Sequence, residues 1–391
     1  NIPEIRFKEF TDVWEQRKAK NLCSITTGKS NTQDQVQDGK YPFYIRSDVP
    51  VRSNRYLYDE EAVITIGDGN IGRVFHYVNG KFDLHQRCYK MADFKALTAK
   101  YFYYYFSTKF YERAMSMTAK ATVDSVRLEM ISDMEIKFPK STTEQTNISE
   151  LLTNLDNLIT LHQRKCDTLV NAKKSLLEKM FPKNSSNIPE IRFKEFTDVW
   201  EQRKLEDFGK ATGGTSIESE FSENGVYKVI SIGSYSENSK YNDQGIRAIL
   251  SDKTKEKILN KSDLTMILND KTANGRIIGR VLYIDKSGTY VYNQRTERIE
   301  IYKESFEPIF IYQLLNAPQI RNKIIKQSQG NTQIFVNWNG IKNTDYLVPN
   351  KTEQIQIGEL FTNLDNLITL HQRKLEKLKN IKKSMLDKMF V

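Results

Sequence analysis

The sequence predicts an α+β protein with a pseudo-twofold internal repeat, in which two globular α/β domains are separated by two long antiparallel coiled-coil helices. Three observations predict this fold. A segment of 18 residues occurs twice, a helical segment of 38 residues occurs twice, and the regions between these repeats differ. Hydrophobic residues make up 39% of the 391-residue chain, a content typical of folded cores.

The repeats set the domain organisation. Residues 1–18 read NIPEIRFKEFTDVWEQRK, and residues 187–204 read the same. Residues 144–181 and 353–390 agree at 27 of 38 positions, and 153–165 is identical to 362–374. The two repeats have offsets of 186 and 209, so the intervening regions differ in length by 23 residues. We therefore predict a first domain with the constant N-terminal segment over 1–143, a central helix and linker over 144–186, a second domain over 187–352 and a distal helix over 353–391.

The junctions between the copies predict how the helices pair. Residues 182–186, PKNSS, join the copies, and joining Val391 to Asn1 would nearly recreate that junction. This symmetry indicates a ring-like arrangement in which both ends of each helix contact both variable domains. The two helices are then antiparallel.

Each repeated helix carries a sustained heptad pattern, with apolar residues at alternating gaps of four and three. A helix of 38 residues is about 57 Å long. We interpret the mid-helix histidines as polar seam residues that fix register, although a metal or catalytic role is an alternative. We expect the seam lysines to reach past the seam to solvent. The stripe could also dock a helix of a partner. The seam positions are Ile148, Leu152, Leu155, Ile159, His162, Cys166, Leu169, Lys173, Leu176 and Met180, and then Ile357, Phe361, Leu364, Ile368, His371, Leu375, Leu378, Lys382, Met385 and Met389.

Composition limits the class of protein. The net charge of +10 and the pI of about 9.1 favour a polyanionic partner. Cys23, Cys88 and Cys166 are scattered, so we expect reduced thiols in a cytosolic protein and no zinc site. No apolar run is long enough to span a membrane, and no signal-peptide pattern opens the sequence.

Two local motifs resemble nucleotide-binding loops and are better read as turns. Residues 67–72 fit GxGxxG, but a strand-like stretch follows where the dinucleotide fingerprint needs a helix. Gly28-Lys29-Ser30 resembles the end of a P-loop, yet Cys23 stands where its first glycine belongs. The second copy has Thr212-Gly213-Gly214-Thr215 instead. We expect no catalytic residues and no metal site in this chain.

The variable domains share three features that could contact nucleic acid. Both contain Ile-Gly-Arg-Val, at 71–74 and 278–281, followed by a glycine and a Gln-Arg pair, at 86–87 and 294–295. Both end in a polar segment, at 120–124 before Pro139 and at 330–333 before Pro349. Gln, Asn and Arg can bond base edges, and Arg and Lys neutralise phosphates. The plainer reading is that these groups hold turns together. The candidate DNA-binding residues are Lys29, Arg46, Asn70, Arg73, Gln86, Arg87, Lys120, Thr122, Arg127, Lys271, Asn274, Arg276, Arg280, Asn293, Gln294, Arg295, Asn331, Thr332 and Gln333.

The aromatic run at 101–106 could stack bases. It lies in a helix-like stretch, and the second copy has a mixed aliphatic and aromatic stretch at 306–315. We therefore predict a packed helix face.

In this order, and twice over, these features resemble the specificity subunit of a type I restriction–modification enzyme of a bacterium. The resemblance spans essentially the whole chain. It rests on the PEIRFKEF…W openings, the TGG turn at Thr212, the Gly-x-Ile-Gly-Arg stretch with its Gln-Arg pair, and the Pro–Glu-Gln–heptad helix that closes each half. The first domain departs from the pattern, with Thr27-Gly28-Lys29 where TGG is usual.

The resemblance implies a function. Each variable domain would be a target-recognition domain that reads one half of a bipartite, asymmetric site in double-stranded DNA. The helices would set the spacer and hold two methyltransferase subunits. Those subunits would methylate adenine with S-adenosylmethionine, and motor–nuclease subunits would use ATP and Mg²⁺. The chain itself would be non-catalytic, bind no cofactor or membrane, and act in the bacterial cytoplasm. The alternatives are an enzyme in its own right, or a scaffold that binds only proteins.

Overall fold

The computed structural model describes residues 2–118, 125–183, 186–271 and 273–390. The chain forms two compact units. The first contains residues 1–164 and 372–391, and the second contains residues 165–371. Each unit therefore combines one variable domain with the beginning of one long helix and the end of the other.

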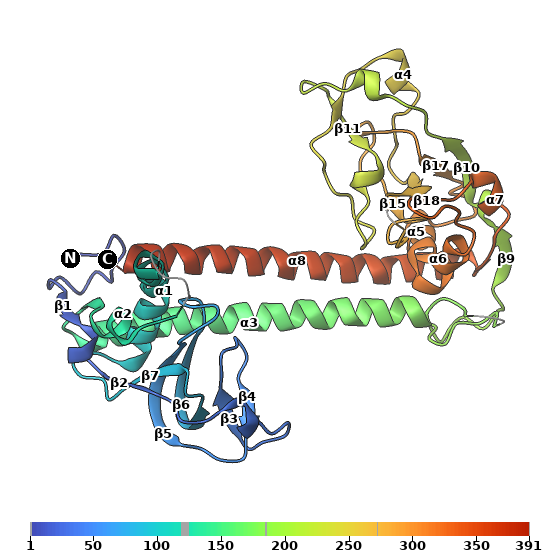
Figure 1. Ribbon diagram of the computed structural model, residues 1–391. Helices are drawn as coiled ribbons and strands as arrows, with labels where there is room; N and C mark the ends of the chain where they lie inside the picture. The colour runs from blue at the N-terminus through green and yellow to red at the C-terminus, as the bar shows by residue number, and fades with distance from the viewer. Residues whose placement is uncertain (1, 119–124, 184–185, 272, 391) are drawn as a thin grey trace. The chain divides into compact units, whose positions relative to one another are not determined.

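The first unit is built on a six-stranded sheet of order β2-β7-β5-β6-β3-β4 (Figure 1). All its pairs are antiparallel except β3 with β6. A separate two-stranded ribbon, β1 with β8, ties the constant N-terminal segment to the strand before α3. The strands are β1 (Glu15–Lys18), β2 (Ser24–Thr27), β3 (Tyr41–Tyr44), β4 (Val51–Ser53), β5 (Tyr58–Ile66), β6 (Phe75–Leu84), β7 (Cys88–Ala92) and β8 (Glu135–Phe138). The helices are α1 (Ala99–Thr118), α2 (Leu128–Ser132), η1 (Ala19–Asn21) and η2 (Thr32–Asp34).

Helix α1 carries the aromatic run into the core of the first unit. Phe102, Phe106 and Phe110 stack in sequence, with ring centroids 5.3 and 4.4 Å apart. Tyr101 is fully buried and meets the ring of Phe390, the residue that follows helix α8 (Lys351–Met389), at 5.5 Å. The predicted packed helix face is therefore confirmed.

The second unit repeats the plan with a more divided sheet. Its main sheet has the order β10-β17-β13-β15, beside a three-stranded sheet β12-β11-β16 and the pairs β14-β18 and β9-β19. The strands are β9 (Glu201–Lys204), β10 (Gly209–Gly213), β11 (Tyr227–Ile230), β12 (Arg247–Ala248), β13 (Leu264–Ile267), β14 (Asn269–Asp270), β15 (Val281–Tyr283), β16 (Tyr290–Tyr292), β17 (Thr296–Ile301), β18 (Ile334–Phe335) and β19 (Asp345–Val348). The helices are α4 (Asp252–Lys255), α5 (Pro308–Asn316), α6 (Pro318–Ile325), α7 (Trp338–Ile341), η3 (Leu205–Phe208), η4 (Glu218–Glu220) and η5 (Ile232–Ser234).

The long helices are α3 (Thr142–Lys179) and α8 (Lys351–Met389), each continuous (Figure 1). Both begin two residues before the repeated segment, because Ser141 and Asn350 act as N-caps. Their side-chain oxygens accept hydrogen bonds from the amides of Glu144 and Glu353, at 3.4 and 3.0 Å.

The helices pack antiparallel within each unit. In the first unit, Asp156 near the start of α3 pairs with Lys382 near the end of α8. In the second unit, Lys173 near the end of α3 pairs with Asp365 near the start of α8, at 2.7 Å. None of the 20 predicted seam residues is exposed. One seam prediction was wrong: the two lysines do not reach past the seam to solvent, because each meets a carboxylate of the facing helix.

Equivalent contacts in the two units hold the constant N-terminal segment against the long helices. Arg6 makes a bidentate ion pair with Glu144, at 2.7 and 2.9 Å. Arg192 does the same with Glu353, with both bonds at 2.8 Å. Next to these pairs, the amide of Ile5 donates to the carbonyl of Lys388, and residues 191 and 179 make the equivalent bond. Each constant segment therefore bonds to the start of one long helix and the end of the other.

Candidate nucleic-acid interface

Three backbone hydrogen bonds gather the predicted contact segments of the first domain. The amide of Gly28 donates to the carbonyl of Cys88 at 3.2 Å, so the turn after β2 lies beside the Gln-Arg pair. The amide of Gly67 donates to Arg87 at 2.7 Å, and that of Val126 donates to Gly67 at 2.7 Å. We call this set of segments, 27–31, 67–74, 86–87 and 125–127, the first platform.

The second domain builds the same arrangement. The amide of Gly214 donates to Thr296 at 2.8 Å, that of Leu268 donates to Arg295 at 2.9 Å, and that of Val336 donates to Leu268 at 2.9 Å. The segments 213–218, 268–271, 273–281, 294–295 and 331–336 form the second platform. Both domains therefore bring the predicted glycine turn, Ile-Gly-Arg loop and Gln-Arg pair together. The predicted polar segment joins them in the second domain, whereas that of the first domain, residues 120–124, lies outside the described residues.

The equivalent hydrogen bonds correct the register of the glycine turn. Gly28 corresponds to Gly214, the second glycine of TGG, and Thr27 stands where the second domain has Gly213. A Cβ at Gly28 would lie 2.2 Å from the carbonyl oxygen of Leu84, and a Cβ at Gly214 would lie 2.1 Å from that of Asn293. Only glycine fits so close to a neighbouring carbonyl. The first domain therefore departs from TGG at Thr27, where the chain has more room.

The glutamine and the arginine of each Gln-Arg pair have different structural roles. Gln86 bonds Asn31 at 2.5 Å, and Gln294 bonds Glu218 at 3.2 Å, so both glutamines brace the loop that follows the glycine turn. The arginine side chains are exposed in both domains. Arg295 has a φ of 69°, a conformation that L residues rarely adopt. The plainer reading, in which these groups hold turns, describes the glutamines better than the arginines.

Asp68 joins two arginines at the first platform. Its carboxylate accepts from Arg87 Nη1 at 2.7 Å and from Arg46 Nη1 at 3.2 Å. Partial burial alone would raise the pKa of Asp68, but the bonds from the two arginines outweigh it and hold that pKa below its usual value. A cavity of about 260 Å³ adjoins this group and is lined by Tyr89 and by residues 27, 67–68, 86–87 and 125–126 of the first platform.

The two Ile-Gly-Arg arginines have different surroundings. Arg73 is exposed and lies over the ring of Tyr111 at 4.6 Å, with a hydrogen bond of 2.7 Å to its hydroxyl. Arg280 is half-buried, and burial lowers its pKa. Its guanidinium bonds Ser239 and the carbonyl of Arg276, each at 3.3 Å. Arg280 is thus committed to holding the second platform, whereas Arg73 keeps an exposed guanidinium.

Sequence reasoning missed Arg321, which supports the second platform from α6. Its guanidinium is buried and donates to the carbonyls of Gly275, Arg276 and Ile278, the last at 3.0 Å. Burial lowers the pKa of Arg321 to about 10. No motif marks it, because the carbonyls that it binds lie 43 to 46 residues earlier in the chain.

The other predicted residues fall into three groups. Lys29, Asn70, Arg127, Lys271, Asn274, Arg276, Asn331, Thr332 and Gln333 are exposed at the platforms. Asn293 is buried, and its side-chain oxygen accepts from the amide of Ile217 at 3.0 Å, so it braces the turn from within. Lys120 and Thr122 lie outside the described residues.

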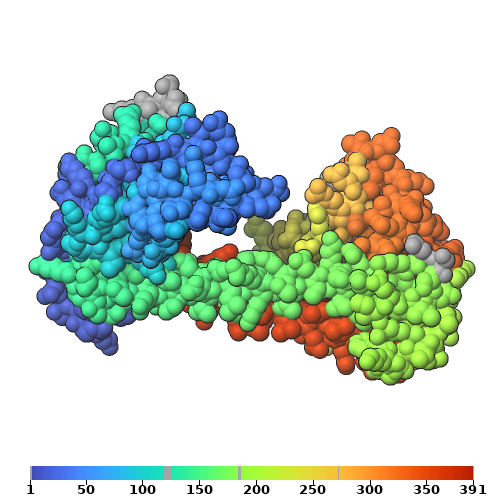
Figure 2. Space-filling view, turned by 90° about the horizontal axis from the view of Figure 1, so that it is seen from below, coloured from blue at the N-terminus to red at the C-terminus, as the bar shows by residue number. Residues whose placement is uncertain are grey.

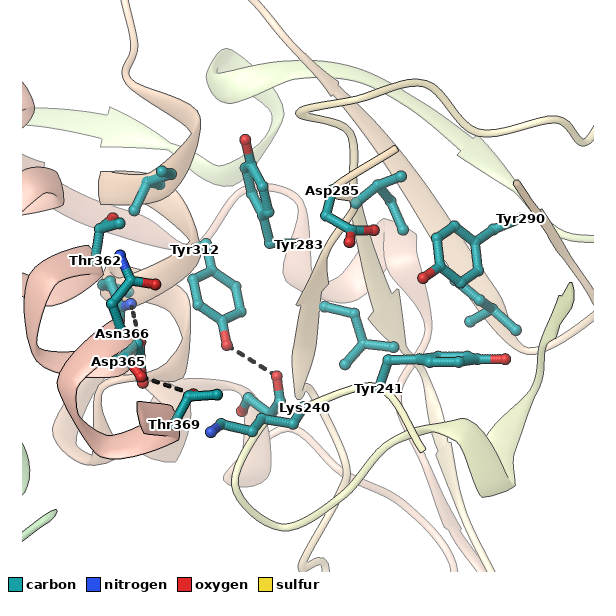
Figure 3. A pocket seen from close by; sticks show the side chains of 16 residues that line it. Lys240, Tyr241, Tyr283, Asp285, Tyr290, Tyr312, Thr362, Asp365, Asn366 and Thr369 are labelled. Carbon is teal, nitrogen blue, oxygen red and sulfur yellow. Dashed lines mark hydrogen bonds between the residues drawn. The ribbon is translucent and has the colours of Figure 1, made fainter. Parts of the chain in front are cut away.

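A separate cavity of about 460 Å³ lies in the second unit, between the variable domain and the start of α8 (Figure 3). Tyr241, Tyr283, Tyr290 and Tyr312 surround it, and Tyr312 donates to the carbonyl of Ser239 at 2.9 Å. It contains no predicted contact residue. Among the described residues, no group of His, Cys, Asp or Glu could hold a metal ion, and no helix is long and apolar enough to cross a membrane.

Comparisons with known proteins identify the class. The family model of the type I restriction modification DNA specificity domain matches twice, over residues 11–171 and 197–380. The chain therefore belongs to this family, with one copy of the domain in each half.

Individual relatives support this assignment, one over nearly its full length and one over part of it. The chain is 23% identical, over 99% of its length and 94% of the relative's, to the type I restriction enzyme MjaVIII specificity subunit of Methanocaldococcus jannaschii. It is 27% identical to the EcoDI specificity subunit of Escherichia coli, over 36% of this chain and 31% of that one. The fold matches the type I restriction–modification S subunit of M. genitalium with a TM-score of 0.67 at 17% identity, covering 100% and 99% of the two chains.

Proposed function

We propose that the chain reads a bipartite, asymmetric site in double-stranded DNA, with one platform on each half-site. The observation that carries this proposal is the platform itself, built twice on equivalent backbone hydrogen bonds but with different exposed side chains. Because the two platforms share a backbone arrangement but differ in their exposed side chains, they should bind two different half-site sequences. The exposed Arg and Lys would neutralise phosphates, and the Arg and Asn groups would contact base edges.

A methylome of cells that carry the complete restriction–modification system tests this proposal. Adenine methylation should fall on a single motif with two defined halves and an undefined spacer. Purified chain with its partners should also lose DNA affinity steeply as salt rises, because phosphate contacts release counterions. Methylation without a split motif would contradict the proposal. Binding to partner proteins with no salt-dependent DNA binding would favour the scaffold alternative.

The paired helices are proposed to set the spacer. Residues 153–165 and 362–374 are identical, and both lie within continuous helices that pair antiparallel in each unit. Inserting one heptad into both stretches keeps the seam in register and adds about 10 Å, close to three base pairs. The spacer should lengthen while both half-sites stay the same. Altered half-site bases would refute the ruler role, and an insertion that preserves the spacer would do so as well.

The outer faces of the same stretches are proposed to dock two methyltransferase subunits. Leu158 and Leu161 are 42% and 46% exposed, and the equivalent Leu367 and Leu370 are 44% and 45% exposed. One face of α3 is open to solvent (Figure 2). Two equal apolar pairs fit two copies of one partner.

Stoichiometry tests the docking proposal. Replacing Leu158 and Leu161 with serine should leave one methyltransferase subunit bound, as native mass spectrometry of the complex would measure. The mirrored variant at Leu367 and Leu370 should give the same result, and the fourfold variant should bind none. Two bound subunits in the fourfold variant would contradict the proposal.

Catalysis and cofactors are assigned to the partners. S-adenosylmethionine would be used by the methyltransferase subunits, and ATP with Mg²⁺ by the motor–nuclease subunits. The purified chain alone should then neither methylate nor cut DNA when all three are supplied. Either activity from the isolated chain would favour the enzyme alternative.

A further inference from the structure

The first platform contains a carboxylate paired with two exposed arginines, and the described residues of the second platform form no such group. Asp68 accepts a hydrogen bond from Arg87 and bonds Arg46 through both carboxylate oxygens. Its own side chain is only 18% exposed, whereas those of Arg87 and Arg46 are 61% and 44% exposed. A mostly covered carboxylate therefore holds two guanidinium groups that are open to a ligand.

The position of Asp68 is fixed by backbone contacts on both sides. Gly67, its neighbour, bonds Arg87 and Val126, and Asp68 forms an isolated β-bridge with Ser125. The backbone of Asp68 therefore cannot shift without disturbing the platform, and its carboxylate is held by the two arginines. A guanidinium has five N–H donors, and Asp68 is the only hydrogen-bond partner of the Arg87 side chain among the described residues. The other donors of Arg87 remain available.

The second platform has an uncharged residue at the equivalent place. Leu268 corresponds to Gly67, so Asn269 corresponds to Asp68 and Arg295 to Arg87. Within the described parts of the chain, the Arg295 guanidinium forms no ion pair. The shared arginine is therefore oriented by a carboxylate in one domain and not in the other.

We propose that Asp68 is a specificity-positioning residue, which orients Arg87 to read one guanine in the half-site of the first domain and restrains Arg46 and Arg87 from binding phosphates indiscriminately. Arginine reads guanine through two parallel hydrogen bonds, so the orientation of the guanidinium decides whether that contact forms. A carboxylate beside it also partly cancels its attraction for phosphate. The first domain thereby gains discrimination at the expense of general affinity. This inference rests on the proposed function.

The test uses Asp68→Asn in the full chain with its methyltransferase partners. Random-sequence selection would measure base preference at every position, and titration against DNA lacking the motif would measure general binding at several salt concentrations. We expect preference for one guanine in one half-site to fall by roughly tenfold. We expect affinity for non-motif DNA to rise and its salt dependence to steepen by about one phosphate contact.

Two further variants separate positioning from simple damage. Arg87→Lys keeps the charge but cannot donate two parallel hydrogen bonds to a base. It should therefore weaken the preference for guanine at the same position without steepening the salt dependence. Asp59→Asn changes the net charge equally at an exposed position in the same domain, and it should leave preference unaltered. A folding defect would weaken motif and non-motif binding together.

The outcomes are distinguishable from those of the parent proposal. If the unaltered complex selects no bipartite motif, the proposed function fails. If it selects one and Asp68→Asn retains full guanine preference, the positioning role of Asp68 is refuted. Relaxation of a position that Arg87→Lys leaves intact would also refute it, because Asp68 would then be reading a base directly.

Discussion

Removing Arg6 should detach the constant N-terminal segment from the first unit. Glu144 is 1% exposed, and its carboxylate accepts two bonds from Arg6 and one from Trp14 Nε1 at 3.3 Å. In Arg6→Met, the Trp14 bond is the one hydrogen bond that the described residues still give to this buried carboxylate. Breaking a buried pair by removing one partner costs about 3–5 kcal/mol, and we expect about 3 kcal/mol here because Arg6 is itself 9% exposed.

Hydrogen exchange read by mass spectrometry would measure this loss locally. Exchange in the segment should speed up by roughly a hundredfold, since 1.4 kcal/mol corresponds to a factor of ten. The peptides must reach beyond residue 18 into η1, because peptides within 1–18 and 187–204 have identical sequences. The mirrored variant Arg192→Met should loosen the second segment alone. Arg203→Met, at an exposed pair, should change little.

Two results would refute this reasoning. One is a cost below about 1 kcal/mol for Arg6→Met, which would show that the carboxylate is not effectively buried. The other is equal loosening of both segments, which would show that the two contacts do not act separately. A double variant that also replaces Glu144 with Leu should recover part of the loss, because no unpaired charge then remains.

Three other variants test the packing and electrostatics of single sites. Gly214→Ala should destabilise the second unit by about 2 kcal/mol in urea denaturation, because of the clash with the Asn293 carbonyl, while Gly340→Ala, which meets no atom within 4 Å, should not. Burial raises the pKa of Glu297 to about 7, above its ordinary 4.5, so the folded state keeps a proton that the unfolded state loses. Stability should therefore fall by about 3 kcal/mol as the pH rises from 4.5 to 7, and Glu297→Gln should remove this contribution in denaturant titrations at each pH. Lys382→Met should lower the free energy of unfolding by less than about 1 kcal/mol, as measured by thermal unfolding, because its ion pair with Asp156 is partly exposed. A larger loss would mean that the packing of the two helices depends on this pair.

The constant segments and the long helices were predictable from the sequence because each of them occurs twice. Literal repeats with two offsets located the constant segments, and the heptad gaps identified every seam residue as covered. The pairing of Lys173 and Lys382 was not predicted. A heptad pattern places a lysine on a helix face, but only the register between two helices shows that Asp365 and Asp156 lie opposite.

The platforms were only partly predictable. Shared short motifs named the segments that meet, but the sequence did not show which residues act as braces. Asn293 and Gln86 have the chemistry of base-reading residues, yet their amides bond neighbouring loops. The sequence showed Asp68 only as part of a glycine motif. Its pairing with Arg46 and Arg87 depends on the fold, which brings together positions that are distant in the sequence.

The first unit contains the end of α8, the last helix of the chain, and this has a consequence for synthesis. Met389 and Phe390 complete the core around Tyr101, so the first unit is made first but cannot be finished until α8 emerges from the ribosome. At about 5–20 residues per second, its aromatic core waits roughly 10–45 s for that helix. The second unit needs only residues 165–371 and is complete sooner. During this interval the nascent first domain exposes the aromatic side chains that Phe390 later covers, and such transiently exposed apolar surface is prone to aggregation.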